Sequence, residues 1–524
     1  MASFLRPGWA LAALLALGCK ADASSAAPTL ESVAATTART APKGPQVTLL
    51  GSVACASLDA CVQVGSTLFA RQFPALEPRL GAARGEFMLL ESSGEMVAAF
   101  RLSGADGQTL REDVQQLERS IGLAISAKAE MATSSSALVL ADDATIAHAA
   151  LALPLSTTAK GAPALTAHFD PSRLSAEQRD ELLAKARAYG DVDDEEVLTA
   201  DGYRRLSRSE HWIGLLESNA MIDATMKAEG SAVVLSASTK PQRGSTLQRS
   251  FAATANHSSR TAPIVPPSGP LSFAARLDVP LEGEALTEFY GGLDELAQVL
   301  PLVLADTPLE LRNPLIEHTM SVAEALQNSL ERDGKLVFDI GANLEGEQEP
   351  TFSLAFTGTG ATGFDALVAA LDTAGRAYPQ PWFEVLAAPK RDYAIAVFRV
   401  DATSRWPAFG QVFGTDTLTA IGSFDGVLLF TFGPQALEHM DRMYERTTST
   451  TPLANAPSGK GHLDVAGLLK MNPRYTDVLG STEMVFDLLI RHDASKMQLD
   501  LRSRVAGDEF VRGFWSGVFK SIRR

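Results

Sequence analysis

Residues 137–153 read ALVLADDATIAHAALAL, a short apolar run that passes directly into a helical pattern. The first five residues are typical of a buried strand, and Asp142 or Asp143 can cap a helix that runs to Leu153. Residues 427–443, VLLFTFGPQALEHMDRM, repeat this order of strand, turn and helix. The recurrence decides the predicted fold, because the same supersecondary unit occurs in both halves of the chain.

Hairpin patterns also occur in the sequence. Two β-like segments, 86–90 and 96–102, are separated by a Gly-containing turn and predict a hairpin. Hairpins of this kind build antiparallel sheets, and the helical patterns between them indicate an α+β fold. We also expect a long helix over 207–229, followed by a second hairpin over 232–253.

The segment 257–270, HSSRTAPIVPPSGP, carries four prolines and no periodic pattern, so we predict a linker there. On either side of it we expect two related domains, 47–256 and 271–524. Each would be an antiparallel sheet of hairpins with helices packed on one face. A chain of 524 residues is long enough for two hydrophobic cores. The alternative is that an α+β protein reuses such pieces without an ancient duplication.

The N-terminal stretch WALAALLALGC, residues 9–19, follows a positively charged start and ends in Gly18 and Cys19. Its apolar run has the length of a signal-peptide core and is too short to cross a bilayer as a helix. The pattern resembles the lipobox of bacterial lipoproteins, although Ala16 and Leu17 depart from the residues usual there. An ordinary secretory signal, cleaved after a small residue nearby, is the alternative.

The resemblance implies that residues 1–18 are a signal peptide and that Cys19 becomes the N-terminus. Cys19 would carry a diacylglyceryl thioether and an amide-linked acyl chain such as palmitate. Two or more chains hold a protein stably at a membrane. Residues 19–46 are rich in Ala, Ser, Thr and Pro, which predicts a disordered tether after the lipidated cysteine. By resemblance to the sorting rules of such lipoproteins, Lys20 after the cysteine, rather than Asp, implies the outer membrane, with the body in the periplasm or at the cell surface.

The two remaining cysteines, Cys55 and Cys61, lie close together in CASLDAC. In an oxidising envelope compartment, such a pair favours a local disulfide. Free thiols are the alternative, and a zinc site would lack two of its four usual ligands. The acidic run 191–196, DVDDEE, lacks the Gly and Glu spacing of an EF-hand loop and indicates a solvated loop. We therefore predict no metal site.

Catalytic motifs are missing from the sequence. It contains no G-x-S-x-G elbow, no G-x-x-x-x-G-K-[ST] phosphate loop and no H-E-x-x-H pair. His168 and His462 stand out among eight scattered histidines, because each lies on a predicted strand two residues before an aspartate, Asp170 or Asp464. In related domains these would be equivalent positions with a structural His–Asp role. We predict no catalytic residue and no cofactor.

The formal net charge is −16, which argues against a nucleic-acid partner, because phosphate binding needs concentrated Lys and Arg. The sequence thus predicts a lipid-anchored cell-envelope protein that binds or scaffolds a protein or envelope partner, held at the membrane by its N-terminal lipid. Two alternatives remain. One is a carrier for a lipid or another hydrophobic ligand in a cavity between sheet and helices. The other is a hydrolase-like enzyme whose site is assembled from residues distant in sequence.

Overall fold

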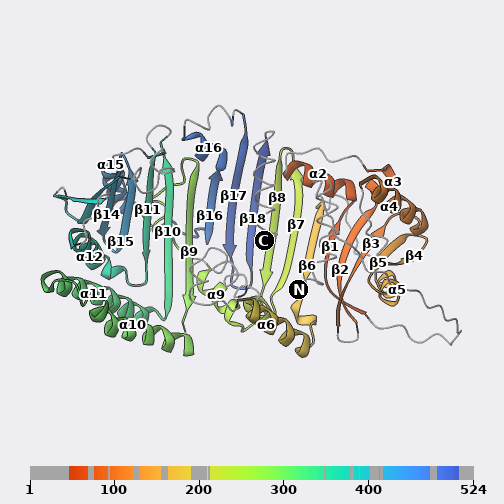
Figure 1. The fold of residues 1–524 in the computed structure, drawn as a ribbon, viewed down its shortest axis with the longest axis horizontal. Coiled ribbons are helices and arrows are strands. Elements are labelled where there is room, and N and C mark those ends of the chain that lie inside the picture. The colour runs from red at the N-terminus through yellow and green to blue at the C-terminus, as the bar shows by residue number, and fades with distance from the viewer. Residues whose placement is uncertain are drawn as a thin grey trace. The chain divides into compact units, whose positions relative to one another are not determined.

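The structure is a computed structural model. It describes residues 47–68, 76–92, 95–121, 129–154, 163–190, 209, 213–255, 257–281, 283–346, 350–377, 383–388, 390–401, 412–413, 417–472, 479 and 481–506. The chain forms two compact units, unit 1 (Met1–Gln242) and unit 2 (Arg243–Arg524). Each unit contains an antiparallel sheet and helices, so the predicted α+β class is confirmed (Figure 1).

The described residues of unit 1 form eight strands in the order β4-β5-β3-β2-β1-β6-β7-β8, and neighbouring strands are antiparallel. The strands are β1 (Val47–Cys55), β2 (Arg84–Ser92), β3 (Glu95–Ser103), β4 (Glu130–Thr133), β5 (Ala137–Ala141), β6 (Leu165–Phe169), β7 (Met221–Glu229) and β8 (Ala232–Lys240). The helices are α2 (Leu58–Leu68), α3 (Pro78–Ala82), α4 (Gly107–Ile121), α5 (Ala144–Ala152) and α6 (Ala176–Gly190).

In the part of unit 2 that the structure describes, ten strands lie in the order β12-β13-β14-β15-β11-β10-β9-β16-β17-β18, and neighbouring strands are again antiparallel. The strands are β9 (Leu271–Pro280), β10 (Lys335–Glu345), β11 (Thr351–Gly358), β12 (Phe383–Leu386), β13 (Ala394–Val400), β14 (Thr417–Phe424), β15 (Val427–Gly433), β16 (Gly459–Asp464), β17 (Glu483–His492) and β18 (Met497–Ala506). The helices are α9 (Thr246–Thr254), α10 (Gly283–Val303), α11 (Leu309–Asp333), α12 (Phe364–Ala377), α15 (Ala436–Ser449) and α16 (Val465–Lys470).

The two strand orders correspond position by position. Read from β14, unit 2 runs β14-β15-β11-β10-β9-β16-β17-β18, and unit 1 runs β4-β5-β3-β2-β1-β6-β7-β8. In both units the first strand lies in the interior of the sheet, between the second strand and a strand from late in the unit. Unit 2 adds β12 and β13 beyond β14. A helix follows β5 and β15 directly, as the recurrence at 137–153 and 427–443 predicts.

Helix α5 shows how the sequence sets these local elements. Asp143 precedes the helix in extended conformation, and its carboxylate accepts hydrogen bonds from the backbone N–H groups of Thr145 at 2.7 Å and Ile146 at 3.2 Å. These bonds satisfy donors that the first helical turn leaves free. The predicted cap is therefore confirmed.

The expectation that helices pack on one face of each sheet is wrong. In unit 1, α5 covers Met88, Ala99 and Val139, while the alternate residues Leu102 and Leu138 contact the helices of the other face. In unit 2, α15 packs on Val397 and Ala420, while α12 packs on Ala396 and Phe398. Since successive strand residues point to opposite faces, helices cover parts of both faces of each sheet.

The long helix expected over 207–229 is wrong in its second half, because Met221–Glu229 forms β7. Antiparallel partners on both sides, β6 and β8, override the helical pattern of this segment. The second strand of the hairpin expected over 232–253 is also wrong. Thr246–Thr254 is helix α9, and Ser245 caps it by accepting a hydrogen bond from Gln248 N at 3.2 Å.

The Pro-rich segment 257–270 is a packed part of unit 2. Thr261 and Ile264 are 0 % and 1 % exposed, and Ile264 lies in the hydrophobic cluster beneath α15. The two compact units divide between Gln242 and Arg243, before this segment begins. It is therefore not a spacer between them. Among the described residues, no helix has both the length and the apolar character needed to cross a membrane.

Candidate functional site

His168 lies on β6 and pairs with an aspartate of the neighbouring strand. Its Nδ1 is 2.8 Å from Asp223 Oδ1, and the two residues are directly opposite in the β6–β7 register. Lys240 on β8 extends the contact, with its Nζ 3.3 Å from Asp223 Oδ2. The His168 and Asp223 side chains are 36 % and 39 % exposed, so the pair is open to solvent.

His462 on β16 repeats this arrangement in unit 2. Its Nδ1 is 2.7 Å from Asp487 Oδ1, again between directly opposed residues, and Arg504 Nη2 lies 4.0 Å from Asp487 Oδ2. The basic residues Lys240 and Arg504 also occupy the same strand position in the two units. Each is directly opposite the residue two positions before the aspartate. His168 and His462 therefore occupy matching positions, with matching partners.

The predicted aspartate partners are not the ones the structure shows. Asp170 caps the short 3-10 helix Pro171–Arg173 by accepting from Ser172 N at 3.2 Å, and Asp464 caps α16 by accepting from Gly467 N at 2.8 Å. Residues two apart on a strand share a face, but both aspartates stand at the strand end, where a helix cap competes for the carboxylate. Their roles correspond as well, although neither contacts the histidine.

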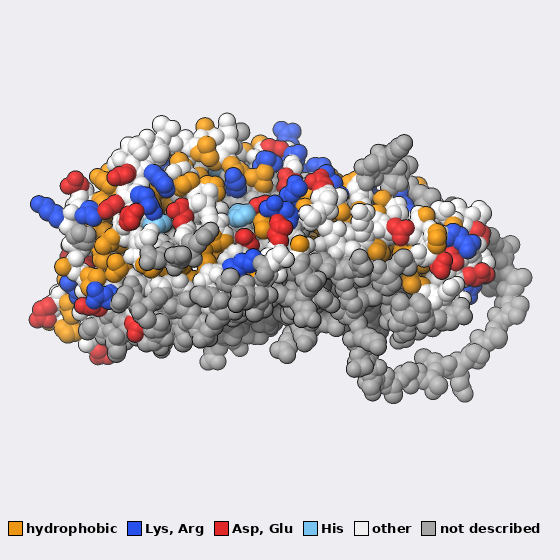
Figure 2. Space-filling model, turned by 90° about the horizontal axis from the view of Figure 1, so that it is seen from above, with side chains coloured by type: hydrophobic (Ala, Val, Ile, Leu, Met, Phe, Trp, Pro, Cys, Tyr) orange, Lys and Arg blue, Asp and Glu red, His pale blue; other side chains and the backbone are white. Residues whose placement is uncertain are grey.

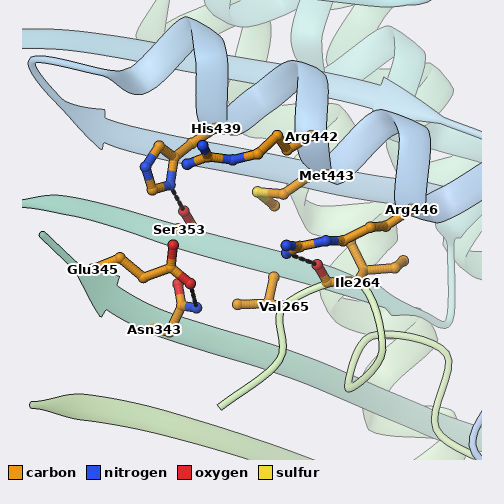
Figure 3. Close-up of a pocket in the computed structure, with 9 residues that line it drawn as sticks. All are labelled: Ile264, Val265, Asn343, Glu345, Ser353, His439, Arg442, Met443 and Arg446. Atoms are coloured by element: carbon orange, nitrogen blue, oxygen red, sulfur yellow. Dashed lines mark hydrogen bonds between the residues drawn. The ribbon is translucent and has the colours of Figure 1, made fainter. Parts of the chain in front are cut away.

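A second polar cluster lies beneath α15 in unit 2. His439, Arg442 and Arg446 project from one side of this helix toward the sheet, where β10 and β11 present Asn343, Glu345 and Ser353 (Figure 3). We call these six residues the α15 cluster. Its members come from segments about a hundred residues apart in sequence, so no local sequence motif predicts the cluster.

The α15 cluster contains one serine–histidine hydrogen bond. Ser353 Oγ is 3.1 Å from His439 Nδ1, and the two residues are 3 % and 5 % exposed. Glu345 is held from the other side, because Asn343 Nδ2 donates to its Oε1 at 2.8 Å. Arg446 Nη1 donates to the carbonyl oxygen of Ile264 at 3.2 Å. These bonds fix the side chains in place.

The space left within the α15 cluster is small. The cavity measures about 10 Å³, which is the lower limit for one water molecule. Asn343 is 1 % exposed, and its Oδ1 has no hydrogen-bond partner within the described part of the chain. A buried amide oxygen of this kind is commonly satisfied by an ordered water. The cluster can therefore hold a water but no organic substrate as it stands.

The matching strand positions of unit 1 are apolar. Asn343 faces Ser272 of β9 and Ser353 of β11, whereas Met88 faces Ser52 of β1 and Ala99 of β3. Met88 and Ala99 are 0 % and 1 % exposed and belong to the hydrophobic core beneath α5. The polar character of the α15 cluster is thus specific to unit 2.

A buried histidine, His439, and a half-buried one, His492, predict a pH-dependent stability. Burial lowers the pKa of His439, with a further lowering by Arg442, and burial lowers the pKa of His492 on β17. Their neutral forms are favoured in the folded chain, so the stability they contribute is present above about pH 6.5, the ordinary histidine pKa, and is lost as the pH falls. We expect the free energy of unfolding, measured with urea, to become smaller as the pH is lowered from 7.5 to 5.

The histidine variants make this prediction specific. His439→Gln should flatten the pH dependence, because glutamine cannot gain the proton that the buried imidazole resists. His148→Gln, at an exposed position of α5, is the matched control and should retain the full pH dependence. An identical slope in wild type and His439→Gln would contradict the assignment.

Cys55 and Cys61 form a disulfide that joins the end of β1 to α2, with Cα atoms 6.0 Å apart. Its loop is short, so the double variant Cys55→Ala/Cys61→Ala should lose about 2 kcal/mol of stability. Urea unfolding with and without reductant measures this. Reductant should lower the wild-type midpoint and leave that of the double variant unchanged, whereas a wild-type midpoint insensitive to reductant would contradict the expected contribution.

Cys19, the tether 19–46 and the acidic run 191–196 lie outside the described residues. Within the described residues, no group of three or more His, Cys, Asp or Glu side chains is arranged to hold a metal ion. Comparison with protein-family models, with curated proteins and with solved structures finds no match to this chain.

Proposed function

We propose that this chain is a lipid-anchored protein of the bacterial cell envelope that binds or scaffolds a partner rather than catalysing a reaction. The single observation that supports a non-catalytic role is the small volume of the cavity within the α15 cluster. Its serine, histidine and arginines surround a space of about 10 Å³, too little for an organic substrate. The anchoring part rests on the lipobox-like residues 9–19 and on the Ala-, Ser-, Thr- and Pro-rich segment after Cys19.

We further propose that the two units arose by duplication of one ancestral unit. The equivalent strand orders support this, and so do the matched His–Asp–cation contacts of His168 and His462. Chance reuse of hairpins does not require the same residue types at the same cross-strand register. The two His–Asp pairs fit a structural role, because each joins neighbouring strands. Among the described residues, neither histidine forms a hydrogen bond with a serine, threonine or cysteine side chain.

The surface charge fits a protein or envelope partner better than nucleic acid. On the face drawn in Figure 2, Lys and Arg side chains are interspersed with Asp and Glu side chains, and the chain as a whole carries a charge of −16. A phosphate backbone requires a continuous basic surface.

Membrane fractionation tests the anchoring. The wild-type chain should stay with bacterial membranes in high salt and be released by detergent, whereas Cys19→Ala should be released without detergent. Cys55→Ala/Cys61→Ala is the matched control and should remain anchored, because those thiols are bonded to each other. Release of the wild-type chain by salt alone would refute the lipid anchor.

A hydrolytic activity is the second candidate function, and the Ser353–His439 hydrogen bond is the observation that favours it. A serine activated in this way should hydrolyse p-nitrophenyl acetate and lose that activity in Ser353→Ala. Under the binding proposal, wild type and Ser353→Ala hydrolyse the ester at the same background rate. The cavity within the α15 cluster is also too small to hold a lipid, as a lipid carrier would require.

A further inference from the structure

Helix α10 is long, apolar and almost uncovered. It spans Gly283–Val303, runs beside α11 (Figure 1), and none of its described side chains is buried. Leu296, Val299 and Val303 follow helical spacing and are 39 %, 42 % and 71 % exposed, while the adjacent Leu302 is 74 % exposed. Leu309, at the start of α11, adds a side chain that is 57 % exposed. We call these five residues the α10 tip.

The corresponding connection of unit 1 contrasts with this exposure. Helix α2 joins β1 to β2 as α10 and α11 join β9 to β10, yet α2 packs on β7 and β8 and buries Leu58, Cys61 and Val64. An apolar helical stripe normally faces a core or a partner. Among the described residues of unit 2, the stripe formed by Leu296, Val299 and Val303 meets neither.

The α10 tip is bordered by carboxylates. Glu295, on the same side of α10 as Val299 and Leu302, and Asp306 and Glu310, which follow the helix, are all exposed, and within the described chain none of the three has an ion-pair partner. Arg312 lies in the same region, where its Nη1 donates to the carbonyl oxygen of Ala305 at 3.4 Å. The tip is therefore an apolar stripe with an acidic border.

We propose that the α10 tip docks an amphipathic, basic helix of a partner protein, which would lay its apolar side chains on Leu296, Val299 and Val303 and its Lys and Arg side chains against the border. This inference rests on the proposed binding function and names its partner class. A second copy of this chain would bring two acidic borders together, which like-charge repulsion opposes. An anionic bilayer is disfavoured for the same reason. The docked helix would present its own apolar side chains at i, i+3 and i+7 spacing toward this stripe.

Peptide binding to the full chain in detergent-free nanodiscs tests the proposal. The probe is a labelled 18-residue helical peptide with a leucine stripe flanked by Lys and Arg, and its matched peptide carries Glu in place of each Lys and Arg. Fluorescence anisotropy should show the basic peptide binding at least tenfold more tightly. Leu302→Glu/Val303→Glu should weaken that binding at least tenfold, and both positions are exposed enough to leave the fold unaffected.

Two further variants sharpen the result. Leu453→Glu, at a residue 48 % exposed outside the α10 tip, is the matched control and should bind the basic peptide as wild type does. Asp306→Lys/Glu310→Lys should shift the preference at least tenfold toward the acidic peptide. Equal binding of the two peptides, or binding unchanged by Leu302→Glu/Val303→Glu, would overturn the proposal.

The other occupants give distinct outcomes. A dye on Leu302→Cys should shift to the blue only when the basic peptide is added. A blue-shifted dye that nitroxide-labelled lipid quenches before peptide is added would overturn the proposal in favour of the bilayer. A dimer in sedimentation that Leu302→Glu abolishes would overturn it in favour of a second copy. Membrane fractionation and the Ser353→Ala assay test the proposed function independently of peptide binding. A failure of the proposed function can therefore be distinguished from a failure of the docking proposal.

Discussion

Replacing Arg101 by Met is expected to destabilise unit 1 by about 3–5 kcal/mol, because it leaves a buried carboxylate without its partner. Arg101 on β3 and Glu86 on β2 are directly opposite, and their side chains are 2 % and 3 % exposed. Arg101 Nε donates to Glu86 Oε2 at 3.2 Å, and its Nη2 donates to the same oxygen. Its Nη1 donates to the carbonyl oxygen of Leu153 at 2.8 Å, which closes the C-terminal end of α5. The free energy of unfolding in urea measures the loss.

Unit 2 offers a matched control for this pair. Arg399 on β13 and Glu384 on β12 are also directly opposite, with a 2.9 Å ion pair, but their side chains are 49 % and 62 % exposed. Arg399→Met should therefore cost less than about 1 kcal/mol. The double variant Arg101→Met/Glu86→Leu should recover much of the loss, because it removes the buried carboxylate together with the guanidinium. Equal effects of Arg101→Met and Arg399→Met would contradict the buried-charge explanation.

Replacing Asp339 by Asn is expected to cost about 3 kcal/mol or more, since hydrogen bonds to a charged group contribute about 1.5–3 kcal/mol each. Asp339 on β10 is 0 % exposed and accepts four hydrogen bonds from the segment that precedes β9. The hydroxyls of Ser259 and Thr261 donate at 2.8 and 2.7 Å, and the backbone N–H groups of Arg260 and Thr261 donate at 2.6 and 3.4 Å. An asparagine NH₂ would face some of these donors and lose their bonds.

Hydrogen exchange distinguishes this local effect from a general loss of stability. In Asp339→Asn the amides of Arg260 and Thr261 should lose protection, in addition to the lower free energy of unfolding in urea. Asp425→Asn is the control, because Asp425 pairs with the Arg260 guanidinium but its side chain is 66 % exposed. That variant should change stability by less than about 1 kcal/mol. Full amide protection in Asp339→Asn would contradict the proposed fastening.

Local features of the fold could be predicted from the sequence. The hairpin of β2 and β3 follows from alternating segments around a turn, and the helix after β5 follows from the cap at Asp143. In each case the residues that decide the structure are close together in the chain. The division of helices between the two faces could not be predicted in this way, because it depends on which strands become neighbours.

The candidate sites show the same limit. The sequence singles out His168 and His462 and suggests that they are equivalent, yet their partners Asp223 and Asp487 come from the next strand of the sheet. Cross-strand register is what brings them together, and register is fixed only when the sheet forms. The α15 cluster carries no signal beyond isolated polar residues in otherwise apolar strands, of which Ser353 is one.

The interior position of β1 and β9 has a consequence for the order of folding. The first strand of each unit is synthesised early but gains its second neighbour only when distant chain arrives, since Gly51 pairs with Phe169 and Leu271 pairs with Leu463. Closing such long loops costs entropy before any contact repays it, and folds rich in these contacts form slowly. Until then each first strand has one open edge, which can pair with other chains. A holding chaperone that covers this edge should therefore raise the yield of folded protein more than one that acts on helices.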